Sequence, residues 1–238
     1  MKHPDIINYD NLRFLVLPSK NPSQKEVQDY NNAYEAWLRV WKDAYKELKL
    51  EKPIYSDEFT RHDHINCIFY GAQCIASVHS RIVDISIPAT VEDSYFKIWN
   101  TQDVKRIRSH GNKVMIISNM TVHKEWRKSF CDLSIKDLII YLCCMRFKSS
   151  AAAVMATYTR NSKNVNELVK RFGAQVIRKD VQNFNKKDLV DLFIFSKDSV
   201  TAGTDPTVQT LGGKLLEKMN GIDHSSESEY PSTNKKVA

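Results

Sequence analysis

The sequence has no run of 18 uncharged apolar residues, which is about the least that a transmembrane helix requires. Its N-terminus, Met1-Lys-His-Pro-Asp-Ile, also lacks the apolar core of a secretory signal peptide. We therefore expect a soluble, cytoplasmic protein without stable membrane insertion.

Cysteine is scarce, and its pattern excludes the usual metal and redox motifs. The five cysteines are odd in number, form no Cys-x-x-Cys pair and have no histidine at a spacing suited to zinc. Most of them lie in apolar stretches, where thiols are usually buried and reduced. We predict no metal site and no disulfide role for the following residues: Cys67, Cys74, Cys131, Cys143 and Cys144.

The chain also lacks a nucleic-acid motif, although it is basic. It carries 35 Lys and Arg against 28 Asp and Glu, which gives a net charge of +7. The basic residues are dispersed, with neither a recognition helix nor an aromatic-basic sheet motif, so we expect no nucleic-acid partner. With 238 residues and 42% hydrophobic content, one core is expected in residues 1–220. The polar tail, residues 221–238, is predicted to be disordered.

The first half of the chain predicts a strand, a long helix and a hairpin. A strand is expected at 12–17, and a helix at 23–50 with one apolar stripe for packing. A polar loop at 53–64 precedes two strands, 65–70 and 73–85, joined at Gly71-Ala72. In the second strand, Ser77, His79 and Arg81 alternate onto one face, which predicts a polar face. A short helix at 91–99 and a basic, polar connection at 105–111 follow.

The second half predicts alternating strands and helices. We expect a central strand at 114–122, a helix at 133–148, a strand at 151–159 and a helix that ends at Gly173. An antiparallel pair, 175–179 with 189–195, completes the sheet. The central strand leads into the basic turn Val122-His-Lys-Glu-Trp-Arg127, followed by a helix N-terminus. Such an arrangement presents unpaired backbone N–H groups to an anionic ligand such as a pyrophosphate or phosphopantetheine.

This segment, 114–176, resembles the acyl-transfer core of the GNAT superfamily of N-acyltransferases. The resemblance extends over about residues 12–197 and implies an α/β (α+β) fold: a mixed, mostly antiparallel sheet flanked by helices, with a V-shaped splay at the central strand. Val122 and Arg127 correspond to the valine and arginine of the family's Val-Pro-x-x-Arg-Gly-x-Gly-x-Gly turn. The turn glycines are replaced by Lys128, Phe130 and Asp132, whose side chains crowd the approach of a coenzyme A diphosphate.

Within the superfamily, the layout is similar to that of autoinducer synthases and long-chain N-acyl amino acid synthases. Three features support this similarity: the loop 57–59, Arg81 at the end of its strand, and Ile87-Pro88 before a short helix. The Glu-x-x-Arg pair usual on the central strand of those relatives is replaced by Ile116 and Asn119. Such relatives take a fatty acyl group from acyl carrier protein, which is acidic and fits a chain of pI about 9.0.

The resemblance implies a donor site along the splayed strand. Its backbone near Met120 would supply the oxyanion donor, and Thr121 and Val122 would pair with the pantetheine amides. The turn residues Arg127, Lys128 and Ser129 would bind the donor's phosphate. The donor is acyl-ACP phosphopantetheine or acyl-CoA, used as a co-substrate without a metal. A candidate carrier-protein surface consists of Lys124, Arg127, Lys128, Arg146 and Lys148.

An amine that attacks a thioester must first lose its proton, so a base is needed near neutral pH. Three candidates are Glu58 in the acidic loop, His79 on the polar strand face and Ser118, which could hold a water. Each has a structural alternative: a solvated carboxylate, a structural histidine or a simple strand serine. Tyr158 is the candidate acid, because the family's usual tyrosine position is Val169 here, although a core tyrosine is the alternative.

Arg81 is the candidate for binding the carboxylate of an amino-acid acceptor through two parallel hydrogen bonds. The alternative is an ion pair with Asp84 or the acidic loop. The leading hypothesis is an N-acyltransferase that moves a long-chain acyl group onto the amine of an amino acid or related small metabolite by direct attack. The alternatives are an acetyl-CoA-dependent N-acetyltransferase and a non-catalytic GNAT-like binding module.

Overall fold

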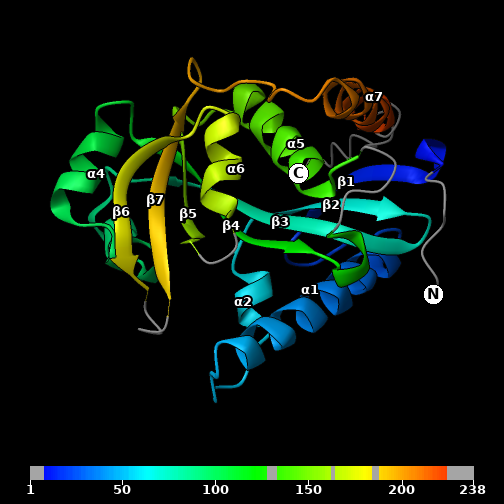
Figure 1. Ribbon diagram of the computed structural model, residues 1–238, viewed down its shortest axis with the longest axis horizontal. Coiled ribbons are helices and arrows are strands. Elements are labelled where there is room, and N and C mark those ends of the chain that lie inside the picture. Colours follow the sequence, from blue (N-terminus) through cyan, green and yellow to red (C-terminus); the bar gives the residue numbers. More distant parts are fainter. Residues whose placement is uncertain (1–7, 128–132, 162–163, 184–187, 224–238) are drawn as a thin grey trace, which may run out of the picture.

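The computed structural model describes residues 8–127, 133–161, 164–183 and 188–223. These residues form one seven-stranded sheet in the order β1-β2-β3-β4-β5-β7-β6, with helices on both faces (Figure 1). All neighbouring pairs are antiparallel except β4 with β5, which is parallel. The predicted fold class, a mixed and mostly antiparallel sheet between helices, is therefore confirmed.

The first four strands and the long first helix lie close to the predicted positions. After the 3₁₀ turn η1 (Tyr9–Asn11), the elements are β1 (Leu12–Pro18), α1 (Val27–Glu47), β2 (His64–Tyr70), β3 (Gln73–Asp84) and β4 (Lys113–Val122). Tyr70 pairs with Gln73 across the two-residue turn, and Gly71 there has φ +58°, a conformation that favours glycine. The hairpin prediction is confirmed.

Between these strands the structure has helices where loops were predicted. The loop 53–64 contains α2 (Asp57–Thr60), and the predicted helix at 91–99 is split into α3 (Pro88–Val91) and the 3₁₀ helix η2 (Ser94–Ile98). The predicted connection at 105–111 is mostly α4 (Thr101–Arg108), which begins at a capping box formed by Asn100 and Asp103. Only Val104 and Ile107 of this helix bear on the apolar core, too few for a periodic signal.

The remaining elements are η3 (Lys124–Trp126), α5 (Ile135–Ser149), β5 (Val154–Arg160), α6 (Val165–Arg171), β6 (Gln175–Gln182), β7 (Leu189–Ser196) and α7 (Pro206–Asp223). Gly173 ends α6 with φ +92°, as predicted. The sequence analysis did not predict α7, because two adjacent glycines, Gly212 and Gly213, interrupt its apolar pattern in the sequence. It ends three residues beyond the expected limit of the folded domain, and residues 224–238 lie outside the described residues.

The helices divide into two layers. Helices α5, α6 and α7 cover one face of the sheet with the largest apolar cluster, whereas α1, α2 and α4 cover the other (Figure 1). On the face of the sheet that α1 covers, Trp37 of α1 and Phe59 of α2 are buried and pack together, with ring centroids 5.3 Å apart. No helix among the described residues is long and apolar enough to cross a membrane.

Candidate functional site

The sheet opens between β4 and β5. Pairing between them is limited to Val114–Ile116 with Val154–Ala156, whereas β4 stays paired with β3 as far as Val122. Just beyond the last pair, the hydroxyl of Thr157 donates to the carbonyl of Ile117 at 3.0 Å. The edge of β4 at 118–122 that faces β5 therefore has no strand partner among the described residues. Such an edge offers backbone hydrogen bonds to an extended ligand.

A bulge lies within this unpaired stretch. Ser118 pairs with His79 and Thr121 with Ser77, so two residues of β4, Asn119 and Met120, oppose one residue of β3. Asn119 has φ +53°, a left-handed conformation that asparagine tolerates better than most residues. A bulge bends the strand that carries it, and this one lies three to four residues beyond the last pair between β4 and β5.

The predicted donor residues lie along this edge. The side chain of Thr121 is buried and engaged, because its hydroxyl accepts from the indole of Trp41 at 3.2 Å and donates to the carbonyl of Asn119 at 3.1 Å. Met120 packs against the α5-side core. The Thr121 side chain is therefore not available to a ligand, whereas the backbone of both residues lies on the unpaired edge.

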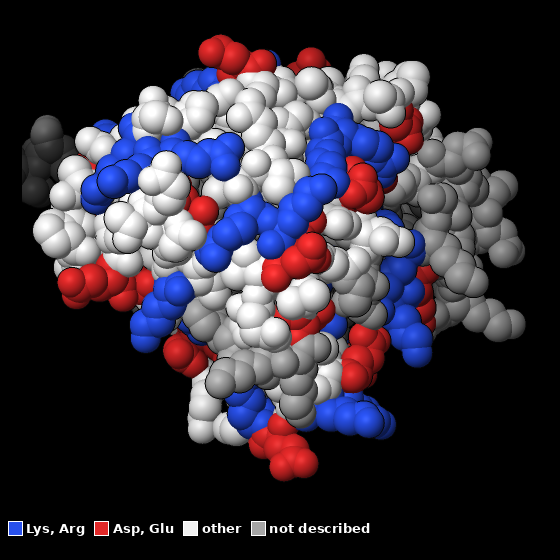
Figure 2. All heavy atoms as spheres, turned by 60° about the vertical axis from the view of Figure 1, so that its left-hand side comes forward, with Lys and Arg blue, Asp and Glu red and all other residues white. Residues whose placement is uncertain are grey.

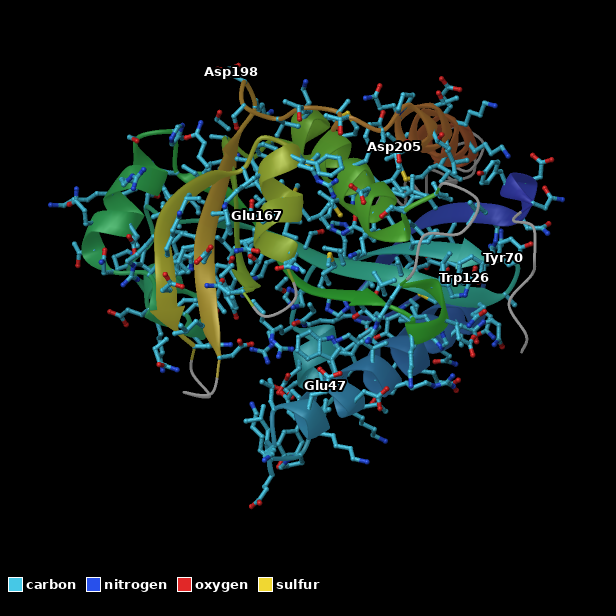
Figure 3. All side chains as sticks on the ribbon, in the orientation of Figure 1. Glu47, Tyr70, Trp126, Glu167, Asp198 and Asp205 are labelled. Atoms are coloured by element: carbon cyan, nitrogen blue, oxygen red, sulfur yellow. The ribbon has the colours of Figure 1, made fainter. Side chains whose placement is uncertain are left out.

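The end of β4 is fixed by the turn that follows it. Trp126 in η3 is buried and packs against Tyr70 of β2 with ring centroids 5.2 Å apart, as Figure 3 shows. The Arg127 side chain is exposed and folds back, so that its Nε donates to the carbonyl of Val122 at 3.1 Å. Lys128 and Ser129, the other predicted phosphate ligands, lie outside the described residues.

Glu58 projects from α2 on the α1 side of the opening. The hydroxyl of Tyr45 on α1 lies 3.1 and 3.3 Å from its two carboxylate oxygens and donates to this carboxylate, while the Lys52 ammonium is 3.9 Å away. Burial, together with the charge of Glu58, raises the pKa of Tyr45, so this tyrosine stays a donor at every physiological pH. Glu58 is thus held in one orientation rather than being a free loop carboxylate.

Tyr158 lies on the same face of the sheet as Glu58. It is two residues beyond Ala156 in the interior of β5, not at the strand end, and packs on Tyr95 with ring centroids 5.4 Å apart. Burial raises its pKa, the charge of Arg61 opposes the rise and that of Glu58 adds to it. A protonated phenol therefore lies within electrostatic reach of Glu58 on α2 and of Arg61, which follows α2.

Two histidines, not one, lie behind the strand edge. His79 has no exposed surface and is enclosed by Phe59, at 4.9 Å between ring centroids, and Trp37 at 6.3 Å. Its predicted role as the base is corrected, because no substrate can reach a ring that Trp37 and Phe59 enclose. The predicted polar face of β3 is likewise buried through residue 80 and not wet.

His62, which follows α2, is the second of the two histidines and lies between His79 and β4. Its Nε2 lies 3.3 Å from the Ser118 hydroxyl and 3.5 Å from the Asn119 amide, and its ring is 5.0 Å from that of His79. Burial and the charges of Arg81 and Arg61 lower the pKa of His62 to about 3, so the ring is neutral. Ser118 is thus bonded to a histidine, and the sequence analysis did not identify His62 as its partner.

Arg81 is not free to bind a substrate. Its two terminal nitrogens make a two-point ion pair with Asp93, at 2.7 and 3.2 Å, and its side chain is 16% exposed. The partner was expected to be Asp84 or the acidic loop if the arginine was structural. Burial is the largest single influence on the pKa of Asp93 and raises it, but the hydrogen bonds from Arg81 and the Tyr95 N–H, together with the charges of Arg81 and Arg61, give a net lowering. The predicted carboxylate clamp is corrected, since the guanidinium already holds a carboxylate of the protein.

The basic residues proposed as a carrier surface do not lie together. Lys124 and Arg127 are exposed beside the end of β4, but Arg146 and Lys148 lie near the far end of α5, roughly 16 Å or more from its start. Arg146 is half-buried and donates to the amide oxygen of Asn66 on β2. On the face in Figure 2, basic and acidic side chains are interleaved.

Sequence reasoning missed Tyr45, His62 and the function of Asn119. Tyr45 lay on the predicted helix, but nothing in the periodicity distinguished it from core aromatics. Asn119 was noted only as a neutral replacement of an arginine. Its left-handed conformation and its contacts depend on the bulge, for which one sequence gives no clear signal.

Comparisons with known proteins agree on the architecture. No protein-family model and no curated protein matches the sequence. Among solved structures, an agmatine N-acetyltransferase mutant in its apo form matches with TM-score 0.54 and 13% identity, covering 77% of this chain and 99% of that one. FeeM, an N-acyl amino acid synthase from uncultured soil microbes, matches with TM-score 0.54 and 8% identity, covering 81% and 96%.

The AHL synthase LasI matches with TM-score 0.51 and 11% identity, again covering 81% of this chain and 96% of its own. The two kinds of synthase named by the sequence resemblance are therefore both represented among the structures that this chain resembles. With the splayed central strand and its bulge, these similarities lead to one conclusion: the protein has the fold of the GNAT N-acyltransferases.

Proposed function

We propose that the protein is an N-acyltransferase that moves an acyl group from a thioester donor to the amine of an amino acid or related small metabolite. The observation that carries the proposal is the juxtaposition of an unpaired, bulged stretch of β4 with an anchored carboxylate, Glu58. The unpaired edge of β4 suits a pantetheine arm, and the carboxylate of Glu58 suits an amine. Direct attack between the two needs no covalent enzyme intermediate.

The donor would lie along 118–122. Pantetheine carries two amides, which can pair with strand backbone as an added strand does. A backbone N–H near Met120, where the bulge interrupts the ladder, would bind the oxyanion that forms at the thioester carbon. Arg127 at the strand end would hold the phosphate at the other end of the arm, since a guanidinium binds phosphate by several hydrogen bonds.

The acceptor would lie between α2 and β5. Its ammonium loses a proton to the Glu58 carboxylate, and the nitrogen lone pair then forms a bond with the thioester carbonyl carbon. The carbon–sulfur bond breaks as the oxyanion collapses, and the thiolate leaves. Tyr158 would donate a hydrogen bond to the departing sulfur. The net reaction converts an ammonium and a thioester into an amide, a thiol and one released proton.

The identity of the donor is the finer part of the proposal. FeeM is an N-acyl amino acid synthase, and this chain shares its fold over most of both lengths. The absence of the three turn glycines after Arg127 disfavours a coenzyme A diphosphate and favours the single phosphodiester of an acyl carrier protein. We therefore propose a long-chain acyl carrier protein as donor and partner, in a cytoplasmic setting.

A second candidate is an acetyl-CoA-dependent N-acetyltransferase. It is favoured by the similarity to an agmatine N-acetyltransferase, whose TM-score of 0.54 equals that of FeeM. The two candidates differ in the donor, not in the chemistry at Glu58. A comparison of donors therefore separates them.

The test is thiol release from long-chain acyl carrier protein, the matching acyl-CoA and acetyl-CoA, each with a mixed amino-acid pool, followed by mass spectrometry. We expect an N-acylated amino acid that forms fastest from the carrier protein. Faster transfer from acetyl-CoA would establish the second candidate instead. Thiol release no faster than in the absence of the protein, from every donor, would contradict the proposed function.

A further inference from the structure

The acceptor side of the site contains one guanidinium that the protein does not use. Arg81 is committed to Asp93 through both terminal nitrogens. Arg61 directly follows α2. Its side chain is exposed and makes no hydrogen bond or ion pair with another described residue. Since Arg61 is not engaged within the protein, it is available to an anionic group of a ligand.

The charge of Arg61 acts on the candidate acceptor site. It opposes the rise in pKa of both Tyr45 and Tyr158, and it contributes to the lowered pKa of His62. Tyr45 is bonded to Glu58 and Tyr158 faces the same space, so the guanidinium lies in reach of the groups around Glu58. An unpaired cation therefore borders the space that we assign to the acceptor.

The backbone positions of Glu58 and Arg61 are fixed relative to each other. They are three residues apart around α2, which puts both on one side of the helix turn. The helix is held at both ends: the Glu58 carbonyl accepts from the Asn119 amide at 3.0 Å, and the Thr60 carbonyl accepts from the Ser19 hydroxyl at 3.2 Å. Phe59 between them is fully buried.

Despite this spacing, Glu58 and Arg61 form no ion pair with each other; the carboxylate accepts from Tyr45 instead. An anchored anion and an unengaged cation, close together but not paired, match a ligand that carries both charges on neighbouring atoms. An α-amino acid is such a ligand, because its ammonium and carboxylate are bonded to the same carbon.

We propose that Arg61 binds the carboxylate of an α-amino acid acceptor while Glu58 binds its ammonium, so that the site selects zwitterions over simple amines. The inference rests on the proposed function and adds the specificity-determining residue to it. Arg61 takes the part that the sequence analysis assigned to Arg81.

The test combines a substrate change with a residue change. For each of several side chains, three acceptors are compared: the amino acid, its amide and its decarboxylated amine, for example leucine, leucinamide and 3-methylbutylamine. The variants are Arg61→Gln and Arg61→Lys, with Lys105→Gln, an exposed residue of α4, as the control for loss of one surface charge. The readout is kcat/KM from thiol release.

Loss of a charge-assisted, two-point hydrogen bond should lower kcat/KM by about 10- to 100-fold. We expect this loss for Arg61→Gln with amino acids, and little change with the amides and amines. Arg61→Lys should recover part of it, and Lys105→Gln should behave as wild type. The ratio of variant to wild type for the same acceptor cancels the different intrinsic reactivities of the amines.

Equal use of amines and amino acids by the wild-type protein would overturn the inference. So would an Arg61→Gln variant that keeps the wild-type preference for amino acids. Failure of the underlying function has a different signature: no acceptor of any kind accelerates thiol release, which overturns the inference together with the acyltransferase proposal.

Discussion

The side-chain amide of Asn119 on β4 donates a hydrogen bond to the backbone carbonyl of Glu58 on α2, with 3.0 Å between nitrogen and oxygen. The residue at the bulge of the donor strand thus holds the helix that carries the candidate base. One side chain links the two halves of the proposed reaction. The same amide nitrogen lies 3.3 Å from Nδ1 of His79, so the link extends into the buried histidine pair.

Substitution of Asn119 separates backbone conformation from this link. Asn119→Gly keeps the left-handed conformation accessible but removes the bond to Glu58, so we expect a lower kcat with little loss of thermal stability. Asn119→Ala loses the bond and adds strain of about 1–2 kcal/mol from φ +53°. The melting temperature should fall further for alanine than for glycine. Similar kcat for wild type and Asn119→Gly would refute a positioning role.

Replacement of the candidate base tests the chemistry directly. Glu58→Gln keeps the shape and can still accept from Tyr45, but it cannot take a proton, so kcat should fall by about 10²- to 10⁴-fold. Glu51→Gln, an exposed neighbour on the same loop, is the matched control and should retain full activity. The measurement is thiol release at saturating donor. A fall of less than threefold for Glu58→Gln would assign the proton to another group.

Acid should destabilise the protein through its buried histidines. The pKa of His62 is lowered to about 3, and that of His79 is well below its ordinary value of 6.5, in both cases first by burial. Because the folded pKa is depressed, the stabilising contribution is complete above the unfolded pKa of 6.5. It is lost as the pH falls from 6.5 toward 3, where the unfolded chain binds protons that the folded one does not.

Protonation of the unfolded chain at His62 should lower the unfolding free energy by about 2 kcal/mol between pH 7 and pH 5, and His79 should act in the same direction. The measurement is urea unfolding at a series of pH values. His62→Gln should reduce the dependence on pH over this range, whereas substitution of the exposed His110 should leave it unchanged. A His62→Gln variant with the wild-type dependence would show that His62 is charged in the folded protein.

Two adjacent glycines of α7 should respond oppositely to alanine. A Cβ at Gly212 would lie 2.3 Å from the ring of Tyr141 on α5, so Gly212→Ala must separate the two helices at a cost of about 1–3 kcal/mol. A Cβ at Gly213 meets nothing within 4 Å, so Gly213→Ala should stabilise the helix by about 1 kcal/mol. Urea midpoints measure both. Equal effects would mean that α7 does not pack on α5 in solution.

The succession of strands and helices could be predicted from the sequence because most strands carry a short apolar run, and α1 and α5 are long enough for periodicity to identify them. Helix α4 could not, since its start depends on a capping box and only Val104 and Ile107 bear on the core. Helix α7 has two glycines, of which Gly212 allows close packing on Tyr141. Local composition does not encode such tertiary packing.

The site was predictable to a smaller extent. Glu58 was identified from its position before the hairpin, and the structure adds Tyr45 as its partner from a distant helix. Arg81 and His79 had the right chemistry and the right strand face, but the protein uses them internally. Contacts between residues far apart in the chain decide which polar groups are available, and a strand pattern does not reveal them.

Protection of backbone amides by a bound donor tests the central claim most directly. Hydrogen exchange would be followed with a non-hydrolysable thioether analogue of long-chain acyl phosphopantetheine. The account predicts slower exchange at 117–122 of β4 and at 158–160 of β5, where pairing between the two strands has ended. No protection at these amides would contradict the account. Protection confined to the pocket that Tyr9, Asp10 and residues of α7 line would also contradict it.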